Sequence, residues 1–327
     1  MAYLSSVEMA SPLSFITSIP LIKATERRLL CKTSPSRSQN RRCATRAVQE
    51  AGDQASIEPK PETPFPVLYD AWFPPNELSI QMQKCVERAV TNGHTLLELQ
   101  WPVVPNLEEI AAGTLLNFKF GKHVSRVLGM DEPKDYMLIK RYLAPFCNLY
   151  WTLCLSQTPC FRDRVVWAVS TDGVSKTAAE GQLKNVRLAS MRNPPETGDD
   201  DVLVIIDPRV NDVWKRGAQL RPKNGYTVFL NSQFNESYGL TGPRRGVLKD
   251  TQVAYMLKRV TRGYVFYAYP GPWRACLEKP DLGIEELKCF EKEPKLRDIA
   301  AVVRLESNRR YGSFYNDRYV RGFGGRL

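Results

Sequence analysis

The amino-acid sequence predicts an α/β domain: a three-layer mixed sheet with helices on both faces and an antiparallel extension towards the C-terminus. Two observations predict this fold. Helical and strand patterns alternate between residues 76 and 230, as in domains whose helices cover both faces of a sheet. Beyond residue 230 the pattern changes to successive strands, which is the order expected of antiparallel neighbours.

The first 46 residues are typical of a targeting segment and not of a folded domain. They contain eight basic residues, two acidic residues and about a dozen Ser or Thr. An Arg- and Ser-rich, acid-poor start is the signature of an organelle transit peptide. The apolar stretch from Leu13 to Ile22 is too short and too hydroxylated for a secretory signal. Ala2 and the late basic cluster favour a chloroplast transit peptide over residues 1–46.

More than half of the net charge of +11 belongs to that segment. The full chain has 46 basic and 35 acidic residues, and without residues 1–46 it has 38 and 33, a net charge of +5. Such a charge is ordinary for a soluble domain, so it weakens any inference of nucleic-acid binding from the pI of the full chain. The remaining residues, about 280 in number, suffice for one large domain with a real core.

The cysteines and histidines form no metal or redox motif. Six of the eight cysteines follow the targeting segment, and none of these belongs to a C-x-x-C pair. We therefore expect scattered buried thiols. With only His94 and His123 in the chain, the sequence predicts no metal site and no cofactor.

Residues 47–66 are polar and proline-rich and predict a linker, so that the single α/β domain is expected over residues 67–303. The first helix should cover residues 76–92, because its apolar residues share one face and Gly93 follows. A strand, LLELQ, closes at Pro102. Residues 106–109 resemble a capping box that opens a helix ending near Gly129.

Four apolar segments predict further strands: VVWAVS from Val165, VRLAS from Val186, VLVIID from Val202 and GYTVFLN from Gly225. The VLVIID run is almost entirely β-branched residues or Leu, as expected of a central strand covered on both faces. The segments YVFYAYPGPW, WRACLE and LKCFEKE predict the antiparallel extension. LRDIAAVVRLES predicts a closing helix, followed by an Arg- and aromatic-rich tail over residues 304–327.

The segment from Tyr142 to Phe161 contains no charged residue and matches a bilayer span in length. Prolines and amides interrupt it, so a buried element is the leading interpretation and contact with a membrane or membrane protein is the alternative. If exposed, its aromatic residues would form a docking surface: Tyr142, Phe146, Tyr150 and Trp151.

Two other features suit a binding partner. Tyr269-Pro270-Gly271-Pro272-Trp273 is a rigid turn, which either anchors Trp273 in the core or presents Tyr269 and Trp273 as aromatic anchors. The tail interleaves aromatic residues with arginines, a composition that fits an acidic partner, anionic lipid or RNA. The tail arginines predicted to bind are Arg309, Arg310, Arg318 and Arg321.

One arrangement could hold a small ligand. Asp172, Asp207 and Asn231 each follow a predicted strand. Ligands of open α/β sheets bind at the carboxyl ends of the strands, so these side chains could converge. No positioned base or nucleophile accompanies them, and Asp-Pro and Asp-Gly are also ordinary turn dipeptides. The sequence therefore names no catalytic residue.

The stretch FLNSQFNESYGLTGPRRG, followed by YMLKRVTRGYVFYAYPGPWRACLE, resembles a plant and cyanobacterial family of domains of unknown function that includes the Low PSII Accumulation type of chloroplast protein. The most specific match is Tyr269-Pro270-Gly271-Pro272-Trp273. The strand entering Asn231, the turn at residues 238–240 and the opening around residues 92–99 also fit. The resemblance covers about residues 67–300.

This resemblance implies a role in the biogenesis of thylakoid electron-transfer complexes and brings no catalytic residues. The chain is closer to the shorter, second plant branch, and residues 131–163 do not match the photosystem II branch, which favours cytochrome b6f slightly over photosystem II. We therefore expect a non-enzymatic assembly or scaffold factor in the chloroplast stroma or at the stromal face of the thylakoid.

The expected partners are subunits of one thylakoid membrane complex and other assembly factors, with peripheral membrane contact as a further possibility. Nucleic acid is not an expected partner. Two alternatives stay open: a small-ligand-binding or enzymatic domain using the strand-end site, and plastid RNA binding through the C-terminal tail.

Overall fold

In the computed structural model, the described residues are 63–68, 70–105, 114–132, 144–170, 185–208, 211–232 and 249–320. The expected transit peptide and most of the expected linker lie outside them, as does the capping-box start near residue 106. The remaining ranges contain the sheet and its covering helices.

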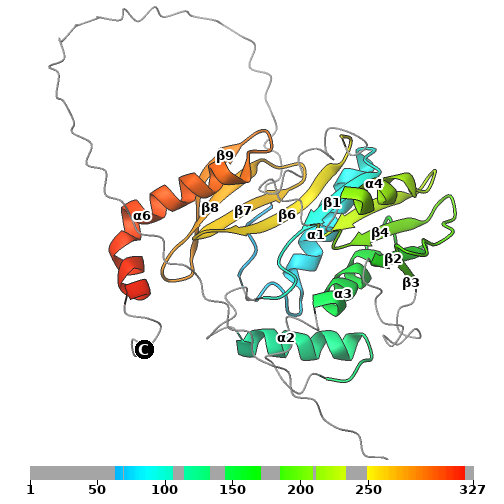
Figure 1. The fold of residues 1–327 in the computed structure, drawn as a ribbon, viewed down its shortest axis with the longest axis horizontal. Helices are drawn as coiled ribbons and strands as arrows, with labels where there is room; N and C mark the ends of the chain where they lie inside the picture. The colour runs from blue at the N-terminus through cyan, green and yellow to red at the C-terminus, as the bar shows by residue number, and fades with distance from the viewer. Residues whose placement is uncertain are drawn as a thin grey trace, which may run out of the picture. The chain divides into compact units, whose positions relative to one another are not determined.

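The described strands form one mixed sheet (Figure 1). They are β1 (Leu96–Gln100), β2 (Val166–Ser170), β3 (Val186–Ser190), β4 (Val202–Ile206), β5 (Tyr226–Leu230), β6 (Gln252–Val260), β7 (Gly263–Ala268), β8 (Trp273–Glu278) and β9 (Ile284–Phe290). Their order is β3-β2-β4-β5-β1-β6-β7-β8-β9. Pairs from β3 to β6 are parallel, and those from β6 to β9 are antiparallel. The predicted mixed sheet with an antiparallel extension is confirmed.

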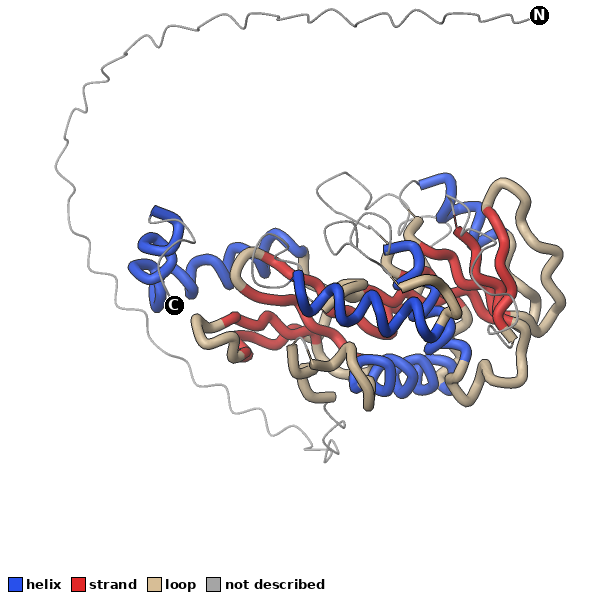
Figure 2. Tube along the Cα trace, turned by 90° about the horizontal axis from the view of Figure 1, so that it is seen from below, coloured by secondary structure: helices blue, strands red, loops and turns tan. Residues whose placement is uncertain are grey.

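Helices pack on both sides of the strands (Figure 2). They are α1 (Glu77–Thr91), α2 (Thr114–Val127), α3 (Ala144–Ser156), α4 (Asn211–Gln219) and α6 (Leu296–Val320). Leu97 and Leu99 of β1 belong to the core beneath α1 to α3, whereas Leu96 belongs to the core beneath α4. This alternation follows from the two-residue period of a strand. We call the side covered by α4 and α6 the α4/α6 face.

The expected central strand is confirmed. All five residues of β4 are buried, because α3 covers one side of this part of the sheet and α4 covers the other. Alternate residues serve the two cores: Val204 packs towards α3 and Leu203 towards α4. A strand covered on both faces needs a continuous apolar run, and VLVII supplies it.

The last residues of the expected linker pack against the fold. The ring of Phe65 lies 5.6 Å from that of Tyr264 and 5.2 Å from that of Phe266, both edge to face. The Arg274 guanidinium donates to the carbonyl oxygen of Thr63. The packed region therefore includes Thr63 to Pro66, although the polar and proline-rich composition of residues 47–66 predicted a linker there.

The C-terminal region differs from the sequence expectation in two ways. Strand β6 was not predicted, although it joins the parallel and antiparallel halves of the sheet. The closing helix α6 continues to Val320, with a kink at Tyr311, so most of the expected tail is helical. Its buried residues Ile299 and Val303 pack on β7 and β8.

Candidate functional site

Two of the three predicted strand-end residues are described, and Asp172 lies outside the described ranges. Asp207 and Asn231 follow β4 and β5, and both adopt left-handed backbone angles, with φ of 46° and 50°. The Asp207 N–H donates to the Leu230 carbonyl oxygen over 2.9 Å, so the two strand ends are neighbours. The structure thus brings Asp207 and Asn231 together at the carboxyl ends of the strands.

The Asn231 amide is occupied by structural hydrogen bonds. Its Oδ1 accepts from the Trp101 backbone N–H over 2.9 Å, and its Nδ2 donates to Asn148 Oδ1 over 2.8 Å. The side chain therefore ties the end of β5 to the end of β1 and to α3. A residue held in this way contributes rigidity at the strand ends, and its amide is not available for a ligand.

Sequence reasoning missed Glu98, a fully buried carboxylate near the carboxyl ends of the same strands. It lies on β1 between Leu97 and Leu99, so its side chain is on the α4/α6 face. The Ser232 hydroxyl donates to its Oε1 over 2.9 Å. The available signal was an acidic residue inside the apolar strand LLELQ, because a buried carboxylate needs a specific polar environment.

Other polar atoms near Glu98 are buried without a hydrogen-bond partner. In the described part of the chain these include Gln100 Oε1 and Thr227 Oγ1. Thr227 pairs with Leu96 of β1, two residues before Glu98, and so lies on the same face. Buried polar groups without partners cost stability, which makes this region a candidate for a small polar ligand.

The aromatic turn after β7 is mainly structural. The Tyr269–Pro270 peptide is cis, and Trp273 is 5% exposed, stacked on Tyr267 with 4.3 Å between ring centroids. This burial contradicts the prediction that Trp273 is an exposed anchor and supports the core interpretation of the turn. The half-buried Tyr269 hydroxyl accepts from Asn92 Nδ2 over 2.8 Å, which fixes the turn to the end of α1.

The aromatic segment before β2 is also buried, apart from Tyr142, which is not described, and Phe146, which is half-buried. Trp151 is fully buried, and its indole N–H donates to the Val103 carbonyl oxygen over 3.2 Å. Tyr150 is 4% exposed and accepts a hydrogen bond from Asn76. The predicted docking surface is therefore wrong for Tyr150 and Trp151. Across the described ranges, none of the helices has both the length and the apolar character to span a membrane.

Of the tail arginines, Arg309 and Arg310 have described side chains, and both bind Glu306. These two hydrogen-bonding guanidiniums lower the pKa of the Glu306 carboxyl to about 2. Arg310 also reaches Glu285 at the start of β9. Arg321 and the side chain of Arg318 lie outside the described part. Arg310 is thus a link between α6 and the sheet.

The six described thiols are free, and three of them are buried. Burial raises the pKa of Cys85 to about 11 and the pKa of Cys147 and Cys276 to about 12. These thiols stay protonated at neutral pH, and the thiol form is a poor nucleophile and metal ligand. Among the described residues, no group of three or more His, Cys, Asp or Glu side chains is placed to hold a metal ion.

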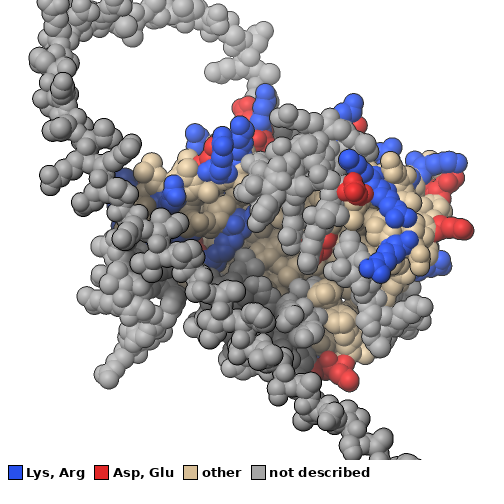
Figure 3. All heavy atoms as spheres, viewed as in Figure 1, with Lys and Arg blue, Asp and Glu red and all other residues tan. Residues whose placement is uncertain are grey.

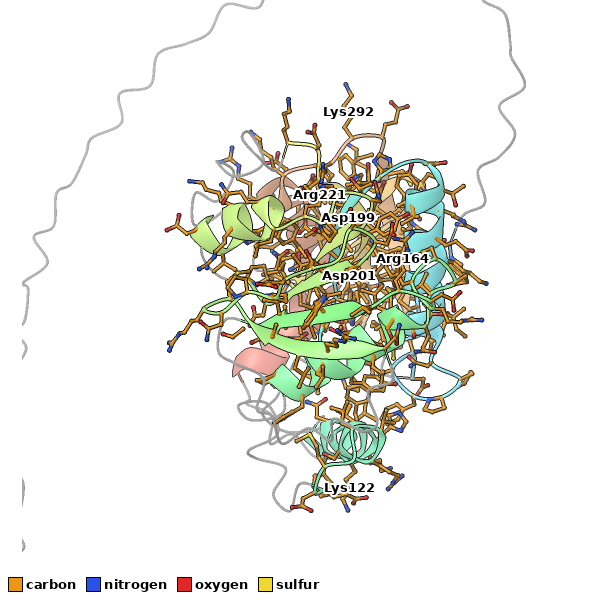
Figure 4. All side chains as sticks on the ribbon, turned by 90° about the vertical axis from the view of Figure 1, so that its right-hand side faces the viewer. Lys122, Arg164, Asp199, Asp201, Arg221 and Lys292 are labelled. Atoms are coloured by element: carbon orange, nitrogen blue, oxygen red, sulfur yellow. The ribbon has the colours of Figure 1, made fainter. Side chains whose placement is uncertain are left out.

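Charged residues at the opposite, amino ends of the strands connect loops. Arg164 Nη1 donates to the Asp200 carbonyl oxygen over 2.7 Å, and Asp201 Oδ2 accepts from the Trp167 indole over 2.9 Å. Figure 4 shows Arg164 and Asp201 at this end of the sheet, with Lys122 of α2 and Lys292, which precedes α6, far apart on either side. The arrangement rigidifies the entry to β2 and β4.

The other feature with binding capacity is the sheet edge at β9, which has no strand paired on its outer side among the described residues; β3 forms the opposite edge. Strand β9 pairs with β8 on one side, and it is the last strand of the sheet. Glu286 and Lys288 are exposed on it, whereas Leu287 packs towards α6. An edge strand presents backbone N–H and C=O groups to which a further strand can pair.

Taken together, these features define a mixed α/β domain with a rigid strand-end network and an open antiparallel edge. The family described as a domain of unknown function, DUF1995, matches residues 75–301, about two thirds of the chain, and the chain belongs to this family. No curated protein and no solved structure gives a significant match. The resemblance to Low PSII Accumulation proteins stays a prediction.

Proposed function

We propose that this chain is a non-enzymatic assembly or scaffold factor for a thylakoid electron-transfer complex, with cytochrome b6f slightly favoured over photosystem II. The protein acts at the stromal face of the thylakoid. Three observations support the proposal: the transit-peptide composition of residues 1–46, membership of the DUF1995 family, and the resemblance carried by Tyr269 to Trp273.

The structural observation that carries the proposal is the open edge at β9. Extended segments bind such edges by adding a strand, with backbone hydrogen bonds supplying affinity and alternate side chains supplying specificity. A newly made membrane subunit has extended loops and termini before it is assembled, so it can supply such a segment. Strand β9, with seven residues, is long enough to pair with one.

The backbone directions along β8 identify which β9 groups face outward. The Glu278 N–H donates to Arg262 on the β7 side, whereas the Lys279 N–H donates to Gly283 on the β9 side. Glu278 pairs with Ile284. Because backbone direction alternates along antiparallel strands, the N–H groups of Ile284 and Glu286 point away from β8. These are the groups that a bound segment would use.

The experiment is co-purification with the tagged mature protein from gently solubilised chloroplast membranes. We expect subunits of one electron-transfer complex and other assembly factors. A Glu286→Pro variant removes an outward N–H and should reduce this capture, whereas Glu286→Ala removes only the side chain and should retain it. Equal capture by both variants, each with an unchanged thermal transition, would count against the β9 edge.

A second candidate function is the binding of a small polar ligand. The specific observation is the buried Glu98 with Gln100 Oε1 and Thr227 Oγ1 nearby, the latter two without partners among the described residues. Native mass spectrometry of the purified protein tests this function. A retained small molecule that is lost in Glu98→Gln supports it, and the bare protein mass in both forms contradicts it.

A further inference from the structure

We propose that the α4/α6 face docks on an anionic lipid bilayer. Cations on both helices attract the anionic headgroups, and the exposed Leu305 of α6 inserts into the lipid. This inference rests on the proposed function for its location at a membrane. It adds the surface that makes the contact and the chemistry of the lipid.

The first cations are on α4. Trp214 fixes the orientation of this helix: it is 1% exposed, stacks on Phe229 with 4.1 Å between ring centroids, and donates to the Pro208 carbonyl oxygen over 3.1 Å. With Trp214 inward, Lys215 and Arg216 are exposed on the outer side. Neither forms an ion pair in the part of the chain that the structure describes. Asp212 is the only acidic residue on this helix.

The second contact is on α6. Ile299 and Val303 are fully buried against the sheet. On the opposite side of the helix, Leu305 is 71% exposed, the largest exposed fraction of any large apolar side chain in the described ranges, and Val302 is 36% exposed. Arg304, next to Leu305 in the sequence, is also exposed and has no ion-pair partner among the described residues. An apolar stripe flanked by arginine suits the boundary between lipid headgroups and acyl chains.

Among the described side chains of α6, the other cations already form ion pairs. Arg309 and Arg310 bind Glu306, and Arg297 Nε lies 3.5 Å from Asp298 Oδ1. The cations available to an external anion are therefore those without described partners, namely Lys215, Arg216 and Arg304. These three residues, with Leu305, define the proposed contact.

The separation of the two helices favours a flat partner over a small ligand. Helix α4 packs on β4 and β5, through Leu203 and Phe229, and α6 packs on β7 and β8, through Val265 and Ala275. With neighbouring strands about 4.8 Å apart, the two contacts lie about 20 Å from each other. Figure 3 shows Lys and Arg side chains over both regions of the molecule. A bilayer spans that distance, and one small anion does not.

The exposed Leu305 favours a bilayer over an acidic polymer as the partner of this surface. RNA or an acidic peptide would use the same cations, but it gains little from Leu305. A bilayer uses both, because the charge attracts anionic headgroups and the leucine inserts among the acyl chains. The combination of an exposed arginine, Arg304, with an exposed leucine, Leu305, on α6 is what selects the lipid.

The test is flotation of the mature full-length chain with phosphatidylglycerol/phosphatidylcholine vesicles and with pure phosphatidylcholine vesicles. Each Lys or Arg at an anionic surface contributes about a fivefold factor to binding. Loss of three cations corresponds to about a 100-fold weaker binding, and Lys215→Glu/Arg216→Glu/Arg304→Glu also adds repulsion, so this variant should bind anionic vesicles at least about 100-fold more weakly. Leu305→Asp should also weaken binding, and pure phosphatidylcholine should bind poorly in every case.

The matched control is Lys84→Glu/Lys119→Glu/Arg162→Glu, which changes the charge equally at exposed sites away from α4 and α6. We expect it to retain vesicle binding. The proposal would be overturned if both triple variants lost binding equally or if the natural chain did not bind vesicles. It would also be overturned if Leu305→Asp bound vesicles unaltered and the protein bound RNA tightly. Co-purification from detergent involves no bilayer, so the variant of α4 and α6 should still capture the client. If the proposed function is wrong, the natural chain itself should capture no client, whatever the result of vesicle flotation.

Discussion

Arg310 and Glu285 join the last helix to the open edge of the sheet. Arg310 Nη1 lies 2.7 Å from Glu285 Oε1, and the same guanidinium binds Glu306 within α6. The pair connects the helix of the proposed lipid surface to the strand of the proposed client site. One ion pair therefore connects the elements that carry the two proposed surfaces.

We predict that Arg310→Ala loosens β9. Removing the guanidinium deletes the ion pair that joins the start of β9 to α6 and leaves the pairing with β8 and the packing of Ile284 and Leu287, so the β9 amides should exchange with deuterium faster than in the natural chain. Arg309→Ala is the control, because Arg309 binds only Glu306 among the described residues. Equal acceleration in both variants would contradict a specific role for Arg310.

Asn231→Ala should destabilise the domain by about 1–3 kcal/mol, because it leaves the Trp101 N–H and Asn148 Oδ1 without partners in a buried place. Urea unfolding measures this loss. If Asn231 instead served a ligand and not the fold, the free energy of unfolding would be unchanged in the absence of ligand.

Trp273→Ala should destabilise the domain by about 3–5 kcal/mol, because the indole is buried and stacked on Tyr267. Thermal unfolding checks this value. Trp273→Phe should restore much of the loss. A stable Trp273→Ala variant that fails to capture client would revive the exposed-anchor interpretation.

Acidification should weaken the packing of α2 on α3. Burial, assisted by Arg126, lowers the pKa of His123, which lies 3.3 Å from the Tyr150 hydroxyl through its Nε2. A lowered folded-state pKa means that the unfolded chain binds more protons, so this contribution is present above about pH 6.5 and is lost as pH falls through the folded-state pKa. Denaturant unfolding across that range should show a weaker pH dependence in His123→Gln. An identical dependence would exclude His123 as the cause.

Cysteine labelling should be selective. Cys289 is the one exposed thiol among the six described, whereas Cys147 and Cys276 are buried with a raised pKa. Brief treatment with iodoacetamide at neutral pH should modify Cys289 first, and peptide mass spectrometry identifies the site. Early modification of Cys147 would show that α3 opens.

Local patterns predicted the elements whose burial is regular. The α1 stripe and the VLVII run were sufficient because each side of those elements meets one environment along its length. Strand β6 was missed because its half-buried end carries Lys258 and Arg259, which obscure the apolar pattern. The length of α6 was missed because the Arg- and aromatic-rich composition after Ser307 is typical of a tail.

The candidate sites were harder to predict, since exposure depends on distant partners. Nothing local distinguishes Trp151 in the core from Trp151 on a surface; its burial is set by helix α2 and the loop at Val103. Glu98 acquires its hydrogen bond from Ser232, a residue 134 positions away. The open edge at β9 exists only in the assembled strand order, which no single segment encodes.

Hydrogen exchange of the complex between this protein and its co-purified client would show where the client binds. Client binding should slow exchange at the β9 amides, including Ile284 and Glu286, and should leave the carboxyl ends of β4 and β5 unchanged. Protection confined to those strand ends, or no protection at β9 in a client-bound sample, would contradict binding at β9.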